Sequence, residues 1–211
     1  MLRLDDDLTD LYRRAEGDPD LAWITAGAGR MLRAPTVFED VVKTICTTNC
    51  SWSATQRMVG AIVGQLGEQA ADSAHRAFPS ARAMAAAGEA WYVEVARAGY
   101  RARSFRELAD AEASGQLDLA ALDAAPDDEA AERFLALRGV GPYAAAHLLL
   151  VRGHASRVVY DSWTRPTTAR LLGKAALTDA QIARRFRRYG PWAGLAHWLF
   201  LTRDWVDAPP V

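Results

Sequence analysis

A Gly-Val-Gly turn at residues 139–141 lies between two stretches of helical pattern, and it limits the folds open to this chain. Residues 132–137 end one helical pattern, and Pro142 is suited to begin another, because proline fits the first turn of a helix. Two helices joined by so short a turn form a hairpin. The second helix then exposes backbone N–H groups at its positive end, where they suit a phosphate. The sequence therefore predicts a helical hairpin that binds an anion.

The rest of the chain also favours helices. Half of its 211 residues are hydrophobic, helix formers fill most windows and alternating β-branched runs are scarce, so we expect an all-α fold. This length is enough for one well-packed domain or two small lobes. Besides the hairpin, helices are expected at residues 36–48, 52–66, 71–78, 81–87, 89–98, from 100 onwards, and at 117–124, 162–172, 178–189 and 191–205.

The first 34 residues are less regular than the remainder. We interpret residues 1–34 as an N-terminal helical segment, a candidate remnant of a larger domain, ahead of a core at residues 35–211.

Composition excludes several classes of protein. The net charge is −1, so no overall basic field attracts nucleic acid, although arginines cluster at residues 101–106 and 184–188. The only cysteines, Cys46 and Cys50, are too few for a four-cysteine iron–sulfur cluster, and the four histidines lack zinc-type spacing. We therefore expect no metal and no cofactor. Neither a long apolar stretch nor a signal peptide is present, which predicts a cytoplasmic protein without a membrane partner.

Asp161 is the strongest candidate for a catalytic residue. It follows the hairpin after Val158, Val159 and Tyr160, which predicts a carboxylate in a partly buried cleft, where its field is strong. Such a group can stabilise a developing positive charge and deprotonate water. The alternative is that Asp161 only caps the helix expected from Ser162, and the two roles are compatible.

The hairpin followed by Asp161 resembles the helix-hairpin-helix DNA glycosylase (HhH-GPD) superfamily. Three further segments are similar to its 8-oxoguanine and alkyladenine glycosylase branch and occur in the family's order: Ile45-Cys46-Thr47-Thr48-Asn49, Gly99-Tyr100-Arg101-Ala102-Arg103 and Gly190-Pro191-Trp192-Ala193-Gly194. Together with the hairpin, these segments span residues 35–205. The resemblance implies two helical lobes with a DNA-binding cleft between them.

The resemblance also implies a role for each motif residue, with Asp161 as the catalytic carboxylate. Asn49 would fill the gap left by a flipped base, Tyr100 would wedge the duplex, and Arg101 would read the orphaned partner base. The implied DNA-binding residues are Gly139, Val140, Gly141, Asn49, Tyr100 and Arg101. The implied base pocket is Tyr143, His147, His197, Trp198 and Leu201, with Trp163 and Trp192 as further stacking surface.

Three positions depart from the family pattern. Bifunctional members carry a Schiff-base lysine where this chain has Tyr143, so we expect hydrolysis by water without a lyase step. An arginine that reads the partner base is replaced by Ala54, so strict preference for cytosine is not implied. His147, His197 and Leu201 stand where the family contacts 8-oxoguanine, so that substrate does not carry over.

The resemblance therefore implies a base-excision-repair DNA glycosylase, expected to act as a monomer at the nucleoid on double-stranded DNA that contains a damaged base. Two alternatives stay open. One is a DNA-binding protein that keeps the hairpin without chemistry. The other is a glycosylase and AP lyase that uses a different amine, such as that of Lys43 or the N-terminus. The lesion, whether alkylated, oxidised, deaminated or mismatched, is left open.

Overall fold

The computed structural model describes residues 2–71 and 73–205, and every regular element in those ranges is helical apart from an isolated bridge between Gln69 and Arg76. This confirms the predicted all-α fold for the described part of the chain. Residue contacts divide the protein into two compact units. Unit 1 holds the described residues of Met1–Arg33 and Leu149–Val211, and unit 2 is Ala34–Leu148. No helix in the described ranges is both long and apolar enough to span a bilayer.

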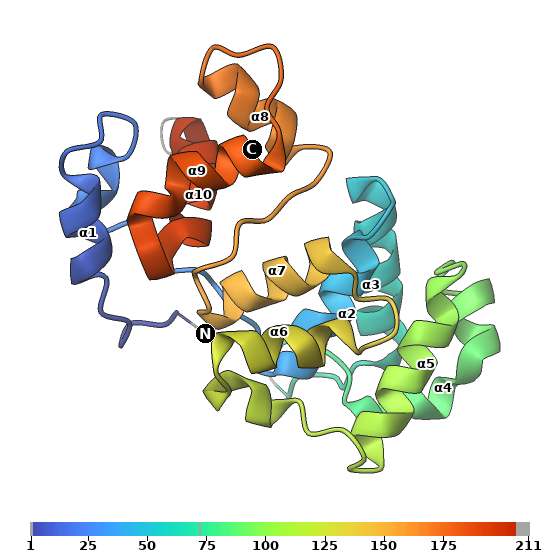
Figure 1. Ribbon diagram of the computed structural model, residues 1–211. Helices are drawn as coiled ribbons and strands as arrows, with labels where there is room; N and C mark the ends of the chain where they lie inside the picture. Colours follow the sequence, from blue (N-terminus) through green and yellow to red (C-terminus); the bar gives the residue numbers. More distant parts are fainter. Residues whose placement is uncertain (1, 72, 206–211) are drawn as a thin grey trace. The chain divides into compact units, whose positions relative to one another are not determined.

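Unit 2 is a bundle of helices around an aromatic and aliphatic core. Its elements are α2 (Val37–Thr47), α3 (Trp52–Leu66), α4 (Ala81–Glu94), α5 (Arg101–Ala113), η2 (Ala120–Ala124), α6 (Asp127–Leu135) and most of α7 (Pro142–Arg152). Helices α4 and α5 lie side by side (Figure 1). Ile45, Tyr92, Phe105 and Phe134 are fully buried. The buried Tyr92 hydroxyl donates a hydrogen bond of 2.6 Å to the Met84 carbonyl, so its polar end is satisfied inside the core.

Capping side chains set the beginnings of the first helices in unit 2. The Thr36 hydroxyl accepts a hydrogen bond of 3.2 Å from the Glu39 amide, and the Ser51 hydroxyl accepts one of 3.3 Å from the Ala54 amide. The helices predicted at 36–48 and 52–66 are confirmed. The two predicted at 81–87 and 89–98 are observed as α4 with a break at Gly88, whose φ is 73°.

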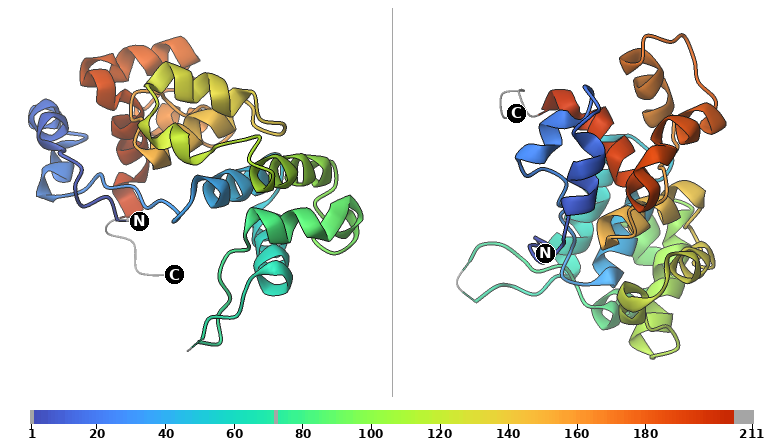
Figure 2. Two further views of the ribbon diagram at one scale, coloured as in Figure 1. Left: turned by 90° about the horizontal axis from the view of Figure 1, so that it is seen from below. Right: turned by 60° about the vertical axis from the view of Figure 1, so that its left-hand side comes forward.

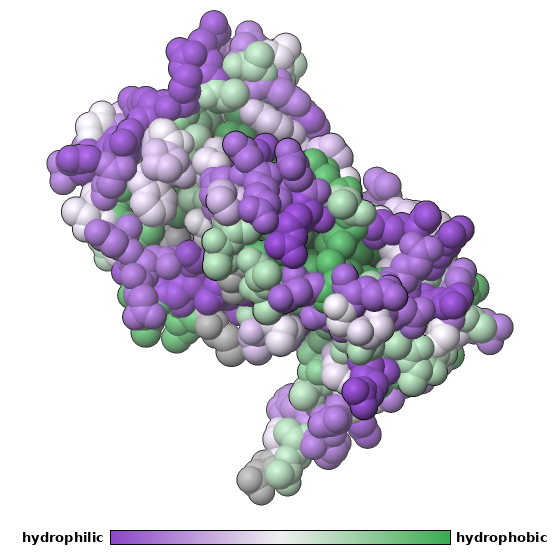
Figure 3. Space-filling model, turned by 60° about the horizontal axis from the view of Figure 1, so that its bottom comes forward, coloured by the Kyte–Doolittle hydropathy of each residue, from purple (hydrophilic) through white to green (hydrophobic). Residues whose placement is uncertain are grey.

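The helix predicted at residues 71–78 is wrong. The described part of the segment between α3 and α4 is a loop, held by hydrogen bonds from the Ala77 amide to Glu68 and from the Ala70 amide to His75. A two-turn helix in isolation is marginal in water, and Phe78 instead packs edge-on against Phe38. The loop extends away from the helices of its unit in Figure 2 and projects from the surface in Figure 3.

Unit 1 is built from both ends of the chain. Its elements are α1 (Thr9–Ala15), η1 (Ala22–Ala26), the end of α7, α8 (Thr164–Leu171), α9 (Asp179–Phe186), η3 (Arg187–Trp192), α10 (Ala193–Thr202) and η4 (Arg203–Trp205). Its core includes Leu11, Ile24, Phe186 and Phe200, all fully buried. Helix α9 begins within the helix predicted at residues 178–189, where Thr178 and Gln181 form a capping box.

A buried carboxylate joins the N-terminal segment to the C-terminal half of unit 1. Asp18 is only 2% exposed and accepts hydrogen bonds from Arg185 at 2.8 Å and from the Tyr189 hydroxyl at 2.6 Å, with Arg188 as a further ion-pair partner. A buried charge is stable only when it is paired and hydrogen-bonded in this way. Residues 2–33 are thereby fastened to α9 and η3.

Candidate functional site

The turn between α6 and α7 forms the helical hairpin that the sequence predicts (Figure 1). Gly139 has a φ of 88°, and a Cβ atom there would lie 2.8 Å from the Ser104 hydroxyl, so a side chain is excluded on two grounds. The Val140 amide donates to the Leu137 carbonyl, and the Gly141 carbonyl accepts the first bond of α7 from Ala145. The first turn of α7 therefore presents amides that have no partner within the helix.

Three separate segments of unit 2 meet at one hollow of about 380 Å³. Thr48 and Asn49 come from the end of α2, Tyr100 from the start of α5, and residues 139–144 from the hairpin and the start of α7. Five of the six residues predicted to bind DNA line this hollow: Gly139, Val140, Gly141, Asn49 and Tyr100. A hollow with free amides and an aromatic ring suits a nucleic-acid backbone and a base.

Asn49 and Tyr100 contact each other at this hollow. Asn49 has a φ of 44°, a left-handed conformation that asparagine tolerates better than most residues. Its side-chain amide donates a hydrogen bond of 3.3 Å to the Tyr100 hydroxyl. The Tyr100 side chain is 65% exposed, so its ring face is open to solvent. An exposed flat ring beside an exposed amide can replace stacking and hydrogen bonds inside a duplex.

Arg101, the sixth predicted DNA-binding residue, lies in the interior and does not line the hollow. It is 7% exposed, its Nε donates to the Thr48 hydroxyl at 3.2 Å, and its Nη1 approaches the Ala98 carbonyl at 3.4 Å. Its guanidinium carbon lies 4.5 Å from the centre of the Tyr100 ring. The sequence placed this side chain against DNA, whereas the structure packs it beneath the exposed tyrosine.

Tyr143 and His147 lie one turn apart on α7, and of these two only Tyr143 lines the hollow. The Tyr143 hydroxyl lies 3.5 Å from the Thr47 hydroxyl, and its ring stacks on that of His147 with centroids 6.1 Å apart. Both side chains are half-buried. The phenol of Tyr143 has no amine and forms no Schiff base. No lysine is among the described residues that line the hollow.

In unit 1 the Asp161 carboxylate caps the start of α8. Its Oδ1 accepts hydrogen bonds from the amides of Trp163 at 2.8 Å and Thr164 at 2.6 Å, and the Thr164 hydroxyl accepts one from the Asp161 amide at 2.9 Å. The side chain is half-buried. No hydrogen bond from the described residues reaches Oδ2. One oxygen is therefore fixed by the backbone, while the other accepts no hydrogen bond from the described residues.

Close packing at α10 holds the segment that leads to Asp161. The amides of Gly194 and Leu195 donate to the Ala155 carbonyl at 2.8 and 3.1 Å. A Cβ atom at position 194 would lie 2.1 Å from the Arg157 carbonyl oxygen, so only glycine permits this approach. The Gly-Pro-Trp-Ala-Gly motif thus fixes the path of residues 155–157 in the same unit.

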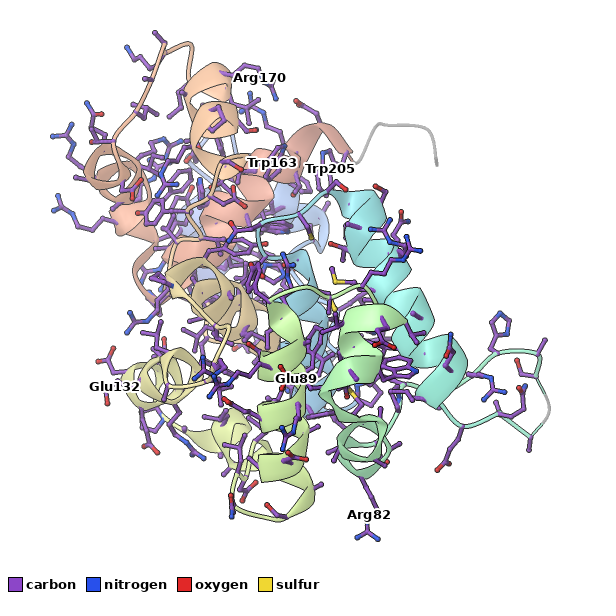
Figure 4. The ribbon with its side chains drawn as sticks, turned by 90° about the vertical axis from the view of Figure 1, so that its right-hand side faces the viewer. Arg82, Glu89, Glu132, Trp163, Arg170 and Trp205 are labelled. Carbon is purple, nitrogen blue, oxygen red and sulfur yellow. The ribbon has the colours of Figure 1, made fainter. Side chains whose placement is uncertain are left out.

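Trp163, two residues after Asp161, belongs to a cluster of three tryptophans. Trp163, Trp198 and Trp205 have ring centroids 5.9–6.4 Å apart, and Figure 4 shows Trp163 and Trp205 close together. Trp163 is 39% exposed and Trp205 is 59% exposed. Trp205 was missed by the sequence analysis, although its position seven residues after Trp198 places it on the same helical face. Exposed indoles offer stacking surface for a flat ring.

Two other candidates in unit 1 are core residues, and a third, the half-buried Trp192, is held by a hydrogen bond. His197 is 1% exposed; its Nε2 lies 2.8 Å from the Thr168 hydroxyl, and burial lowers its pKa to about 4, so the ring is neutral at pH 7. Leu201 is 3% exposed. The Trp192 indole donates a hydrogen bond of 3.0 Å to Asp10 and is a structural contact instead of a stacking platform. Neither His197 nor Leu201 presents an open surface to a base.

No protein-family model matches the chain, and no curated protein matches its sequence. Solved structures do match. The protein named MBOgg1, in complex with a low-affinity DNA ligand, superposes with a TM-score of 0.80 at 21% identity over 98% of this chain and 73% of that one. The 8-oxoguanine glycosylase/lyase of Clostridium acetobutylicum, bound to double-stranded DNA with cytosine opposite 8-oxoG, gives 0.77 at 23% identity over 98% and 73%.

The 3-methyladenine DNA glycosylase of Archaeoglobus fulgidus gives a TM-score of 0.72 at 24% identity, over 95% of this chain and 71% of that one. The TM-scores establish a common fold, and identities of 21–24% establish no more than the fold. The protein has the fold of the helix-hairpin-helix DNA glycosylases, as the resemblance in its motifs predicts.

Proposed function

We propose that this protein is a DNA glycosylase of base excision repair, which removes a damaged or mismatched base by hydrolysis of the N-glycosidic bond. The observation that carries the proposal is the hollow of unit 2, where Asn49, Tyr100 and the hairpin glycines converge from three segments. Among the solved structures that share the fold, two are named as glycosylases, of 8-oxoguanine and of 3-methyladenine in DNA, and two are complexes with DNA. Fold and hollow support the same partner, which is double-stranded DNA.

Each unit has its own part in the proposed reaction. In unit 2, the amides at the start of α7 bind a backbone phosphate, while Asn49 and Tyr100 occupy the space of an extruded base. For each phosphate whose charge the protein neutralises, log affinity falls by roughly 0.9 per tenfold rise in salt concentration. Binding should therefore weaken steeply as the salt concentration rises. A protein whose affinity is the same at low and high salt would not fit this function.

In unit 1, Asp161 carries out the chemistry. As the bond between C1′ and the base breaks, its electron pair leaves with the base and positive charge develops on the sugar. The Asp161 carboxylate stabilises that charge, and its Oδ2 accepts a proton from the water that forms the new bond to C1′. The indoles of Trp163, Trp198 and Trp205 supply the stacking surface for the base.

We further propose that the protein is monofunctional and works without a cofactor. The position of a Schiff-base lysine is occupied by Tyr143, and the chain has only two lysines. Lys43 is ion-paired with Glu39 and lies 5.5 Å from the Phe78 ring centre, and Lys43 does not line the hollow. With two cysteines the chain cannot bind a four-cysteine cluster. We also propose that the protein acts as a monomer in the cytoplasm, at the nucleoid.

The experiment is a panel of end-labelled duplexes, each with one lesion: an alkylated purine, an oxidised purine, a deaminated base or a mismatched pyrimidine. After incubation, half of each sample is heated in alkali, which cleaves abasic sites, and half is left untreated. Cleavage of one lesion only after alkali is the expected result and identifies the substrate. Cleavage without alkali contradicts the monofunctional mechanism.

The second candidate function is that of a DNA-binding protein without chemistry. The loss of the lysine at position 143 and the inward orientation of Arg101 are the observations that favour it. Salt-dependent binding to duplex DNA without cleavage of any lesion in the panel, before or after alkali, would establish this function instead.

A further inference from the structure

Arg101 is the most enclosed charged side chain next to the hollow. Its guanidinium bonds to Thr48 and Ala98, and its Nη2 is buried without any partner. The neighbouring Tyr100 is 65% exposed, whereas Arg101 is 7% exposed and contributes nothing to the lining of the hollow. A guanidinium in this orientation presents no donor to the edge of a base.

An enclosed guanidinium with an unsatisfied donor carries a cost, so its position needs a compensating contact. The contact is with Tyr100, since the cation lies 4.5 Å from the ring centre and attraction between a cation and a ring strengthens when water is excluded. A second contact is with Thr48. The Thr48 hydroxyl donates to the Ile45 carbonyl at 2.8 Å and so has lone pairs left to accept from Arg101. The arginine thereby joins the end of α2 to the base of the exposed ring.

The remaining side chains at this surface are poor readers of base identity. The Asn49 amide already donates to the Tyr100 hydroxyl, and Thr48 is engaged on both sides. Ala54 has no polar group. The exposed face of Tyr100 stacks on any base, because every base has a π-face. Direct discrimination of bases needs two hydrogen-bonding groups placed together on a side chain, such as the two N–H donors of a free arginine fork.

We propose that Arg101 is a positioning residue that holds the wedge Tyr100 from inside the protein, and that the enzyme consequently acts with similar efficiency opposite all four partner bases. The proposal rests on the function proposed above, since it concerns the duplex around an extruded base. It differs from the role that the sequence resemblance implies, in which Arg101 itself reads the orphaned base.

The test uses the full chain and duplexes that contain a tetrahydrofuran abasic-site analogue opposite A, C, G or T, with affinity measured by fluorescence anisotropy. The wild-type protein should bind the four within about threefold of one another. Arg101→Met keeps an apolar stem and removes the cation, so it should weaken binding by about three- to tenfold, equally for all four. Arg101→Lys should recover part of the loss. Arg106→Met, on the exposed face of α5, is the matched control.

A second readout separates positioning from general instability. With 2-aminopurine as the partner base, stacking on Tyr100 quenches its fluorescence. Arg101→Met should weaken the quenching, while its thermal unfolding is followed in parallel. Tyr100→Ala should abolish the quenching and match the uniform loss of affinity.

Several results would overturn the inference. A wild-type preference of more than tenfold for one partner base, or a loss in Arg101→Met confined to one partner, would show that Arg101 reads that base. Unchanged affinity and quenching in Arg101→Met would show that Arg101 does not hold Tyr100 in position. If Arg101→Met fails to fold, the wild-type panel and Arg101→Lys decide. Failure of the wild-type protein to bind any of the duplexes would contradict the proposed function itself.

Discussion

Replacing Asp161 by asparagine should separate two tasks of its carboxylate, which caps α8 through Oδ1 and, in the proposed function, uses Oδ2 for chemistry. The asparagine amide oxygen can still accept the bonds from Trp163 and Thr164. Neutral hydrogen bonds have about half the strength of charge-assisted ones, and a lost charge at a helix start adds roughly 0.3–1 kcal/mol. Asp161→Asn should therefore lower the free energy of unfolding by only about 1 kcal/mol.

Asp161→Ala removes both cap bonds. Its expected cost is about 2 kcal/mol of unfolding free energy, the upper end of the usual range for loss of a capping side chain, because the charge and both bonds are lost together. Both variants lack the charge that opposes the positive sugar, so excision should fall by about 10²- to 10³-fold in each, as it does when a preorganised electrostatic group is removed. Stability thus distinguishes the variants, whereas the rate of excision does not.

The assay is single-turnover excision of the lesion identified by the duplex panel, with urea unfolding of the same samples and affinity for an abasic duplex as a control. An Asp161→Asn variant that retains more than about a tenth of the wild-type rate would refute the catalytic role. Equal destabilisation of the two variants would refute the capping argument.

Two further predictions concern the hairpin and the buried histidine. Gly139→Ala places a Cβ at positive φ and against Ser104, so it should lower the free energy of unfolding in urea by about 1–3 kcal/mol. Gly141→Ala has open space around its Cβ, so it should leave stability unchanged. It should weaken DNA binding in an anisotropy titration. His197 has its folded-state pKa lowered from 6.5 to about 4, so the unfolded chain takes up the proton first as pH falls. Stability should be complete above pH 6.5 and should decline by about 3 kcal/mol towards pH 4, and His197→Gln should reduce that decline in unfolding curves measured across this range.

Local signals in the sequence predict the features that depend on local chemistry. Thr36, Ser51 and Thr178 cap helices where a hydroxyl precedes a helical pattern. The hairpin at 139–141 follows from its glycines, one of which has the positive φ that glycine permits. These features need only a few neighbouring residues, so sequence alone is enough to place them.

Side-chain direction at a helix end depends on distant residues, so a local sequence pattern does not indicate it. Tyr100 and Arg101 are neighbours at the start of α5, yet one faces solvent and the other faces Thr48, fifty-three residues earlier in the chain. Trp192 hydrogen-bonds to Asp10, a partner that no local pattern indicates. The helix predicted at residues 71–78 is wrong for a similar reason, because Phe78 packs against the distant Phe38.

The two-part make-up of unit 1 has a consequence for how the protein is made. Unit 2 is continuous in sequence, so all of its residues have been synthesised before residue 149 is joined. Asp18 must wait for Arg185, 167 residues later, which at 5–20 residues per second is a delay on the order of ten seconds. During that time the N-terminal segment lacks the partners of its buried carboxylate. Unit 1, which carries Asp161, is therefore the last part to be assembled during translation, and Asp18 gains its buried partners only at that stage.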